Sequence, residues 1–502
     1  TAGTGSFITT VPNGQTSQGF TFQGVEGASG TVGIVVSEPR FIPDTFYVTV
    51  VQPGVEIQGL LTTTTTLSGD DNFYAQVGVP NTTGTILQRA QNVRPGAPGP
   101  LNVTFTSRVT SVGTIVDSTS GAAGNVTGTA RIPSGLYYTS TAGPAAGGVA
   151  FHPVGTGSTD ITVGIAGYLT MSTNGTRTIT VSQPTITVSS NYPQVGGGLQ
   201  ESGSVVLSAG NHGGASVTLA SSDPTVALVA TGLTDPGAPS VTVNLSNGQT
   251  SFTYYVQVLE GQTGGFTLTA TEPRFTSGST NVTAVTPGIE IQGLTTTTTT
   301  LSPNSGFYAQ VGVLNGQATG LIRAQNVRGG APKEVTATFT STPASVGTIV
   351  DSVSGPNGAP TGTARIPIGR YYTQTGGNPA NGGTAFHPLL SGQAAVSVAA
   401  PGFTTASTNG TRTITVTQPG ISLSLNYPQV GSGLQESGGG SLGASNHGGV
   451  TVTLTSSLPS VLLLAPDAST PGQASIQIPV ANGSTSFLFY VQGVEQATGT
   501  VT

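Results

Sequence analysis

A long internal repeat dominates this sequence and limits what the chain can fold into. The segment "VEIQGLLTTTTTL" at residues 55–67 returns 234 positions later as "IEIQGLTTTTTTL" at residues 289–301. Farther along the chain the offset becomes 235, as in "NYPQVG" at residues 191–196 and 426–431. Periodicity over the whole chain predicts a tandem array of related units.

Four prolines divide the repeat. Pro53, Pro184, Pro287 and Pro419 are spaced by 131, 103 and 132 residues, and each lies between two short alternating runs. Proline ends strands and stiffens linkers, so each repeat is predicted to hold a longer and a shorter domain. The predicted domains are residues 1–52 (partial, the C-terminal half of a shorter domain), 53–183 (longer), 184–286 (shorter), 287–418 (longer, a repeat of 53–183) and 419–502 (truncated shorter, a repeat of 184–267).

Short alternating runs indicate that these domains are built from β-strands. In "FTYYVQV" at residues 252–258, apolar and polar side chains alternate with the period of a half-buried strand. Asn174-Gly175 and Asn247-Gly248 separate such runs, and Asn-Gly favours hairpin turns. The 75 Gly and 33 Pro would interrupt most helices. The predicted fold class is all-β: tandem immunoglobulin-like β-sandwich domains in a linear array.

The composition narrows the functional classes. Charged residues make up 6% of the chain, against about 25% in an ordinary soluble protein. The net charge of −6 includes no basic stripe, so nucleic-acid binding is excluded. No apolar run approaches the ~20 residues that would span a bilayer. Cysteine is absent, and with the abundance of Thr, Ser, Asn and Gly this favours an extracellular, cell-surface protein of bacterial type.

Three segments carry a resemblance to a known family. They are "VTLASSDPTVALV" at residues 217–229, "PNGQTS" at 12–17 and "VQGVEQATGTVT" at 491–502. They resemble the tandem Ig-like repeats of large bacterial cell-surface and adhesin-type proteins, more clearly in the shorter domains than in the longer ones. The resemblance implies an extended extracellular rod or fibre, and it brings no catalytic residues.

The two ends of the sequence are interpreted through the same repeat. The chain opens with "TAGTGSFITT", without Met or a charged leader, so we expect a processed or interior piece of a longer polymer. Residues 419–502 match 184–267, and residues 1–52 match 235–286. If two chains met head to tail, residues 34–52 could supply the missing strands, but residues 1–33 would then duplicate 470–502. We therefore expect a simple cut through a continuous chain.

The candidate metal ligands are few. All four histidines are repeat copies, His152 with His387 and His212 with His447, so each domain holds at most one. A metal site needs several converging ligands, and Cys, HxH and DxDxDG patterns are absent. Asp70 and Asp71 are not retained in the second copy. The prediction is structural histidines in turns, no metal and no cofactor.

Catalytic arrangements are equally sparse. Glu201 and Glu436 are copies of one lone acid, and Glu56 and Glu290 are copies of another. A glycosidase needs a pair of carboxylates, and these lone acids have no partner residue for that chemistry. No G-x-S-x-G elbow accompanies a histidine and an acid. These acids are interpreted as solvated or hydrogen-bonded groups near turns, and the chain is predicted not to be an enzyme.

The Thr run leaves three interpretations open. It lies just after the proline between domains, where the first strand of the longer domain is expected, and β-branched Thr suits an edge strand with both faces partly wet. Clustered Thr is also a substrate for O-glycosylation. An ice-binding face would need Thr arrays on several adjacent strands, and each repeat holds one run.

Eight N-x-[ST] sequons occur, at Asn81, Asn102, Asn125, Asn174, Asn244, Asn281, Asn409 and Asn482. Only Asn174 and Asn409 are repeat equivalents, which makes them the candidate N-glycosylation sites. The hairpin-turn interpretation of the same Asn-Gly pairs is equally good.

Two functions remain. The first is a structural extracellular repeat protein that forms a surface fibre, filament or stalk, and that self-associates into filaments or lateral bundles through strand edges with few charges. The second is an adhesin or binding module that recognises glycans or a partner cell through exposed loops, such as the Tyr-bearing segments at residues 136–141 and 370–375.

Overall fold

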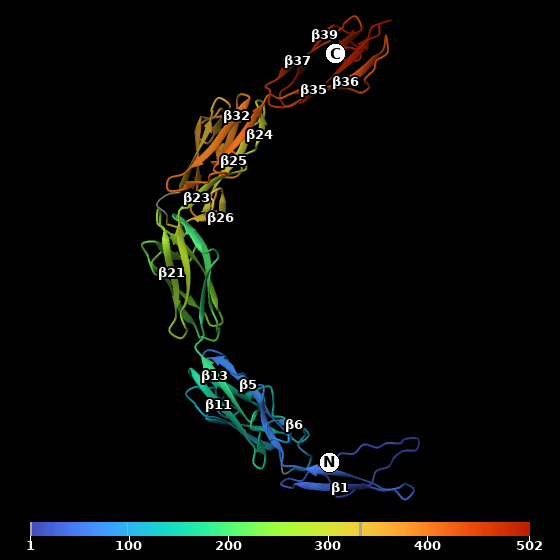
Figure 1. Ribbon diagram of the computed structural model, residues 1–502, viewed down its shortest axis with the longest axis vertical. Coiled ribbons are helices and arrows are strands. Elements are labelled where there is room, and N and C mark those ends of the chain that lie inside the picture. The colour runs from blue at the N-terminus through green and yellow to red at the C-terminus, as the bar shows by residue number, and fades with distance from the viewer. Residues whose placement is uncertain (1–2, 98, 331–333) are drawn as a thin grey trace.

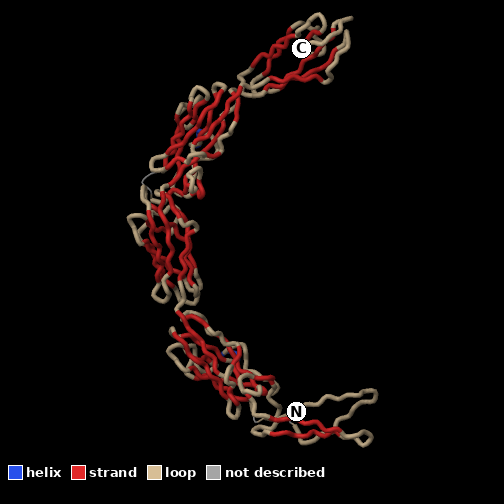
Figure 2. The backbone as a smooth tube through the Cα atoms, viewed as in Figure 1, coloured by secondary structure: helices blue, strands red, loops and turns tan. Residues whose placement is uncertain are grey.

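The chain forms an extended arc with its two ends at opposite tips (Figure 1). The computed structural model describes residues 3–97, 99–330 and 334–502. Within them there are forty strands and two short 3₁₀ helices, so the regular secondary structure is almost entirely β (Figure 2). The all-β prediction, with sandwiches in a linear array, is confirmed.

The first long unit (residues 53–183) is a sandwich of two sheets. One sheet has six strands in the order β12 (Leu169–Thr170), β3 (Gly54–Gln58), β5 (Asp71–Pro80), β10 (Val149–Pro153) and β8 (Gly113–Val116), with β6 (Leu87–Ala90) paired to β5. The other has the order β4 (Thr63–Thr65), β13 (Thr176–Ser182), β11 (Gly157–Gly164), β7 (Leu101–Ser107) and β9 (Thr127–Ile132). The 3₁₀ helix η1 spans Pro144–Ala146.

The second long unit (residues 287–418) repeats this arrangement. Its first sheet has the order β29 (Gly347–Val350), β31 (Thr384–Pro388), β25 (Ser305–Leu314), β23 (Pro287–Gln292) and β33 (Thr404–Thr405), with β26 (Leu321–Ala324) paired to β25. Its second has the order β24 (Thr297–Thr299), β34 (Thr411–Thr417), β32 (Gly392–Ala399), β28 (Val335–Thr342) and β30 (Thr361–Ile366). The helix η2 spans Pro379–Asn381.

The short unit (residues 184–286) is a smaller sandwich. One sheet has the order β14 (Ile186–Ser190), β16 (Leu199–Leu207), β20 (Ser251–Val258) and β18 (Ala227–Ala230), and β27 (Asn326–Val327) joins it from the second long unit. The facing sheet has the order β15 (Gln194–Gly196), β22 (Gly278–Val285), β21 (Gly264–Thr271), β17 (Ala215–Ser221) and β19 (Ser240–Leu245).

The two ends of the chain form smaller sheets. The N-terminal segment (residues 3–52) holds a single hairpin of β1 (Gly30–Val36) and β2 (Asp44–Val50). The C-terminal unit (residues 419–502) has a four-stranded sheet in the order β35 (Ile421–Leu425), β36 (Gln435–Leu442), β40 (Ser486–Gly493) and β38 (Leu462–Ala465), and a two-stranded sheet of β37 (Val450–Thr455) and β39 (Ser475–Val480). The four prolines remain our proposed domain boundaries, and Pro287 is the first residue of β23.

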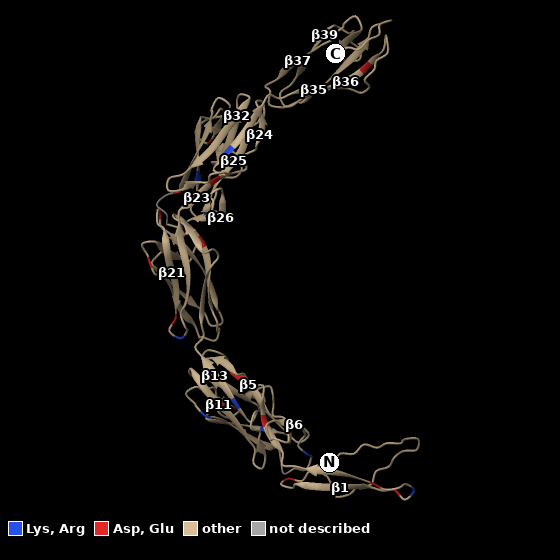
Figure 3. Cartoon of the chain, viewed as in Figure 1, with Lys and Arg blue, Asp and Glu red and all other residues tan. Residues whose placement is uncertain are grey.

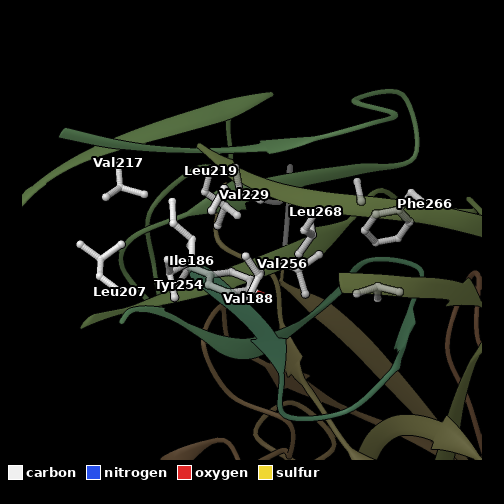
Figure 4. Close-up of a cluster of buried hydrophobic side chains, with 14 of the residues drawn as sticks. Ile186, Val188, Leu207, Val217, Leu219, Val229, Tyr254, Val256, Phe266 and Leu268 are labelled. Carbon is white, nitrogen blue, oxygen red and sulfur yellow. The ribbon is translucent and has the colours of Figure 1, made fainter. Parts of the chain in front are cut away.

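Apolar side chains from the two facing sheets fill each sandwich. In the short unit, Val217 and Leu219 of β17 lie opposite Tyr254 and Val256 of β20 (Figure 4), and all four are fully buried. That core contains 21 buried residues, whereas the core of the C-terminal unit contains eight. The smaller core follows from the two-stranded second sheet, which covers less of the facing sheet.

The Thr run forms an edge strand, as the simplest interpretation predicts. Residues Thr63–Thr65 make up β4, which lies at the edge of its sheet and pairs in parallel with β13. The position within the unit differs from the prediction, because β3 comes first and lies in the opposite sheet. The chain therefore crosses from one sheet to the other between Gln58 and Thr63, and the run begins the second sheet.

Candidate functional site

The motif "RAQNVR" at residues 323–328 connects the short unit to the second long unit. Its first two residues end β26, and the chain then leaves that sheet as β27. Strand β27 pairs antiparallel with β16, with Leu199 opposite Val327 and Gln200 opposite Asn326. One sheet thus contains strands of both units, and backbone hydrogen bonds cross the junction.

Leu199 enters the core of the neighbouring unit. It belongs to β16 of the short unit, but it packs in the hydrophobic cluster of the second long unit together with Ile289 and Val327, and it is 0% exposed. Full burial of a leucine side chain contributes about 1.5–3 kcal/mol. The junction therefore has an apolar anchor as well as a shared sheet.

A buried carboxylate holds the centre of the junction. The Glu201 side chain is 5% exposed and accepts two hydrogen bonds from Arg323, from Nε to Oε2 at 3.1 Å and from Nη2 to Oε1 at 2.9 Å. Gln325 Nε2 donates to Glu201 Oε2 at 3.1 Å and to the Gln194 carbonyl at 2.7 Å. Paired, charge-assisted hydrogen bonds of this kind offset the cost of removing the carboxylate from water. They also raise the pKa of Arg323, whose guanidinium lies 6.0 Å from the Tyr192 ring centre.

A second ion pair lies farther along the same interface. Arg328 donates from Nε and Nη2 to the two carboxylate oxygens of Glu260, at 3.0 and 2.8 Å. The Arg328 side chain is nearly buried, and its backbone N–H donates to the Gly198 carbonyl at 3.1 Å. The amide of Gly329 donates to Gln200 Oε1 at 3.2 Å. Two bidentate pairs, a shared sheet and a buried leucine fix the relative orientation of the two units.

Part of this interface recurs at the start of the chain. Arg94 occupies the position of Arg328 in the repeat, and it forms an ion pair with Glu26, which occupies the position of Glu260. The hydrogen bond from Arg94 Nη2 lowers the pKa of the Glu26 carboxyl. Arg89, at the position of Arg323, is exposed, and the described residues give it no ion-pair partner. Charged side chains are otherwise few and scattered (Figure 3).

The junction between the first long unit and the short unit is more lightly built. The Gln183 side chain donates to the Pro273 carbonyl at 3.2 Å, and Leu67 packs against the core of the short unit. Ion pairs across this boundary are absent from the described part of the chain. The two junctions of the short unit therefore differ in kind: one is a shared sheet with buried charges, and the other is a short linker.

A polar hollow of about 420 Å³ opens beside the Glu201–Arg323 pair. Tyr255 and Tyr371 belong to its lining, and Tyr371 stacks edge-on against Tyr372 with ring centres 4.7 Å apart. The Tyr-bearing segment at residues 370–375 therefore reaches the junction. In the first long unit, Tyr137 and Tyr138 repeat the edge-on pair at 4.9 Å.

The structure corrects the interpretation of the acids as groups near turns. Glu56 is buried on strand β3, where Gln58 Nε2 and Gln76 Nε2 each donate to Oε1 at 2.8 Å and the Leu87 amide donates to Oε2 at 3.1 Å. Glu290 has the equivalent place in the second long unit. Glu201 is a buried member of an ion pair across the junction. Only their hydrogen bonding was anticipated, because a strand position buried on both faces does not show the alternation of a half-buried strand.

The two candidate glycosylation sites lie against these buried acids. Asn174 Nδ2 donates to Glu56 Oε2 at 3.4 Å, and Asn409 Nδ2 donates to Glu290 Oε2 at 3.1 Å. Nδ2 is the atom that would carry a glycan, so glycosylation would require each side chain to leave its glutamate. N-glycosylation at Asn174 and Asn409 stays a prediction, and the geometry gives both residues a structural role.

Two of the four histidines lie in turns as predicted, but His152 and His387 lie on strands β10 and β31, where Nδ1 hydrogen-bonds Asp70 Oδ1 and Asn304 Oδ1, each at 2.7 Å. His212 Nε2 donates to the Gln249 carbonyl at 2.8 Å, and its Nδ1 accepts from the Gly214 amide at 3.1 Å. His447 repeats the arrangement with Ser484 at 2.9 Å. Within the described ranges, His, Cys, Asp and Glu side chains form no group of three or more that could hold a metal ion. Nor do those ranges contain a helix long and apolar enough to cross a membrane.

Comparison with known proteins finds structural neighbours only. No family model matches the sequence, and no curated protein matches it. The chain is similar to invasin, a bacterial integrin-binding protein, at 14% identity over 63% of this chain and 56% of that one, with a TM-score of 0.20. It is similar to the Escherichia coli adhesin FdeC at 11% identity over 73% of this chain and 96% of that one, with a TM-score of 0.19. It is also similar to domains 4 and 5 of the S-layer protein SbsC at 14% identity over 46% of this chain and 97% of that one, with a TM-score of 0.22. Bacterial adhesins and an S-layer protein are thus among the structures that this chain resembles.

The repeat pattern alone did not predict this junction. A usable signal was present in the composition. Because 6% of the residues are charged, a charged residue that is present in both copies of a repeated motif is a candidate for an ion pair. The motif "RAQNVR" holds two such residues in each copy: Arg89 corresponds to Arg323, and Arg94 corresponds to Arg328. The identity of the partner was not accessible, because Glu201 lies 122 positions from Arg323.

Proposed function

We propose that this chain is a structural extracellular repeat protein that forms part of a surface fibre, filament or stalk. The observation that carries the proposal is the junction of β16 with β27, where backbone pairing, Leu199 and the Glu201–Arg323 pair fix one sandwich to the next. A fixed junction suits a load-bearing rod, because it limits bending between neighbouring units.

The surface chemistry supports the same proposal. A 49.8-kDa chain with 6% charged residues presents mostly hydroxyl, amide and glycine surface. Strand edges with few Lys or Glu side chains have little charge to prevent pairing with a neighbouring chain. Lateral association into bundles built this way is expected to survive 1 M NaCl, where the Debye length is about 3 Å.

The test is electron microscopy of the native material with antibody labelling of the cell surface. We expect labelled, ordered filaments whose repeat follows the length of the chain, and these filaments should persist in 1 M salt. Label confined to the cell interior would refute the extracellular assignment. Single flexible rods on the surface, without any ordered polymer, would refute the fibre and favour the second candidate.

The second candidate is an adhesin that binds glycans. The hollow beside Arg323 favours it, since Tyr371 and Tyr255 offer aromatic surface and the neighbouring amides and charges offer hydrogen bonds. Glycan-array binding of the intact chain tests it. Tyr371→Ala should abolish binding while Tyr137→Ala, the repeat equivalent, leaves it intact; an array without any signal from the intact chain rejects this candidate.

A further inference from the structure

We propose that mild acid weakens the second long unit and spares the first, because one difference between the two copies decides whether a protonated histidine has an anionic partner. The histidine is His152 in the first long unit and His387 in the second. Its partner is Asp70 in the first copy and Asn304 in the second. The inference goes beyond the proposed structural role, because it gives the array a response to pH.

The two histidines have the same place in the fold. His152 lies on β10 opposite Thr114 of β8, and His387 lies on β31 opposite Thr348 of β29. The tetrapeptide "AFHP" that contains them is identical at residues 150–153 and 385–388. The two copies are therefore a matched pair, in which strand register and local sequence are constant and the partner residue differs.

In each unit the imidazole Nδ1 lies 2.7 Å from one side-chain oxygen. That oxygen is Oδ1 of Asp70 in the first long unit and Oδ1 of Asn304 in the second. A neutral imidazole with its hydrogen on Nδ1 can donate that hydrogen to a carboxylate oxygen or to an amide oxygen. Both units can therefore make the same hydrogen bond while the histidine is neutral.

Protonation separates the two units. An imidazolium beside the Asp70 carboxylate forms an ion pair, and its hydrogen bond becomes charge-assisted. An imidazolium beside the Asn304 amide keeps the hydrogen bond but gains no opposite charge. Burial lowers the pKa of His387 from the ordinary 6.5. Because the folded pKa lies below the unfolded value, the stabilising contribution of neutral His387 is present above pH 6.5 and is lost as the pH falls through the folded pKa.

The neighbouring carboxyl groups do not reverse this contrast. Asp117 and Asp351 are repeat equivalents that follow β8 and β29, and in both the hydrogen bonds outweigh burial and lower the pKa. They therefore act alike in the two units. Asp71, next to Asp70, has its pKa raised from 3.8 by burial, although the Leu61 amide donates to it at 2.9 Å. A raised carboxyl pKa favours the folded state in acid, so Asp71 also favours the first long unit.

One ion pair near the first histidine has no counterpart in the second long unit. Arg108, in the loop before β8, lies 3.6 Å from Asp160 of β11, and the equivalent residues are Thr342 and Ala395. The Arg108 side chain is largely exposed. Exposed pairs of this kind contribute little to stability, so this pair adds little to the difference between the units.

The unit that acid weakens is the one that completes the fixed junction. It supplies β27, Arg323 and the core in which Leu199 is buried. Loss of stability in the second long unit therefore also loosens its attachment to the short unit. The first long unit, with Asp70 beside its histidine, keeps its stability under the same conditions.

Hydrogen exchange of the full-length chain tests the contrast, with the peptides that cover β10 and β31 compared in one sample. Their identical tetrapeptides give closely matched intrinsic exchange rates at any pH. On going from pH about 7 to pH about 5, the protection of β31 relative to β10 should fall about 2- to 10-fold. Equal changes in the two strands, or a greater loss in β10, would overturn the proposal.

A reciprocal exchange of the partner residue gives the matched variants. Asn304→Asp should remove the extra loss of protection in β31, and Asp70→Asn should make β10 lose protection to the same extent. Each variant introduces the residue that the other copy already holds at that position, so both should fold. A β31-to-β10 ratio that neither variant changes would overturn the assignment of the acid response to this partner.

Two further measurements identify the titrating group. His387→Gln removes the imidazole, and the fall in the ratio should disappear with it; a fall that persists would overturn the role of His387. In NMR of the chain with labelled histidines, the His387 midpoint should lie below 6.5 and should rise in Asn304→Asp. A midpoint that Asn304→Asp leaves unchanged would contradict the proposed ion pair. These measurements use the purified chain, so they are independent of surface labelling, which tests the proposed function.

Discussion

The short unit and the C-terminal unit place matching sequences in two different surroundings. The segment "GLQESG" is identical at residues 198–203 and 433–438. In the short unit its leucine is 0% exposed, and in the C-terminal unit its leucine is 66% exposed. The difference comes from what packs against the segment: β27, Arg323 and the core of the second long unit in one case, and solvent in the other. Burial here is therefore a property of the junction, and the local sequence does not determine it.

The largest expected effect comes from truncating the leucine in each surrounding. Leu199→Ala leaves a cavity in the core of the second long unit and should lower the free energy of unfolding by about 2–5 kcal/mol. Leu434→Ala changes an exposed side chain and should lie within about 0.5 kcal/mol of the unaltered chain. Calorimetry at a dilution where the chain is monomeric measures both. Equal losses from the two substitutions would show that the surroundings do not differ as described.

A smaller difference in the free energy of unfolding is expected when the glutamate of "GLQESG" is replaced in each unit. Glu201→Gln removes the charge that holds Arg323 and Gln325, and it should cost about 1–3 kcal/mol, because Arg323 is partly exposed and can regain water. Glu436→Gln removes a carboxylate without an ion-pair partner in the described ranges, so it should be nearly neutral. Urea unfolding followed by far-UV circular dichroism provides the comparison. A neutral Glu201→Gln would mean that the shared strand and Leu199 alone hold the junction.

The smallest expected difference between the two units is in how their stability changes at low pH. Asp467 of the C-terminal unit accepts hydrogen bonds from the side chains of Ser469 and Thr470 and from their amides, which lowers its pKa to about 2 from 3.8. Gly232 has this position in the short unit. Because the folded pKa lies below the unfolded value, the stabilising contribution is complete above pH about 4 and is lost as the pH falls from 3.8 towards 2.

Carboxyl NMR of Asp467 measures this titration directly, with an expected midpoint near 2. Asp467→Asn should lower the melting temperature of the C-terminal unit at pH about 6, and the loss should be much smaller at pH about 2, where about half of the Asp467 carboxyl is protonated. A midpoint near the ordinary 3.8 would show that these hydrogen bonds to the Asp467 carboxylate do not form in solution.

Features that depend on short-range sequence pattern could be predicted. Period-2 alternation and the scarcity of helix formers gave the fold class, because a half-buried strand fixes which side chains face the core. The edge position of the Thr run also followed from residue preference. Glu56 was misjudged because β3 is buried on both faces, so a polar residue within "GVEIQ" lies in the interior among side-chain amides.

The candidate site lay beyond such reasoning. Glu201 and Arg323 are 122 positions apart and come from different units, so neither local pattern nor composition pairs them. The opposite exposures of Leu199 and Leu434 arise in identical hexapeptides, which no reading of the hexapeptide alone can separate. Relations between units become visible only when the array is assembled.

Hydrogen exchange measured by mass spectrometry tests the central claim most directly. The peptides that cover β16 (Leu199–Leu207) and β36 (Gln435–Leu442) are compared in the same monomeric sample. We expect slow exchange in β16, which pairs with β14, β20 and β27, and distinctly faster exchange in β36, which pairs with β35 and β40 and belongs to the unit with the smaller core. Equal protection of the two strands would contradict the claim that the junction, and not the repeat sequence, sets their burial.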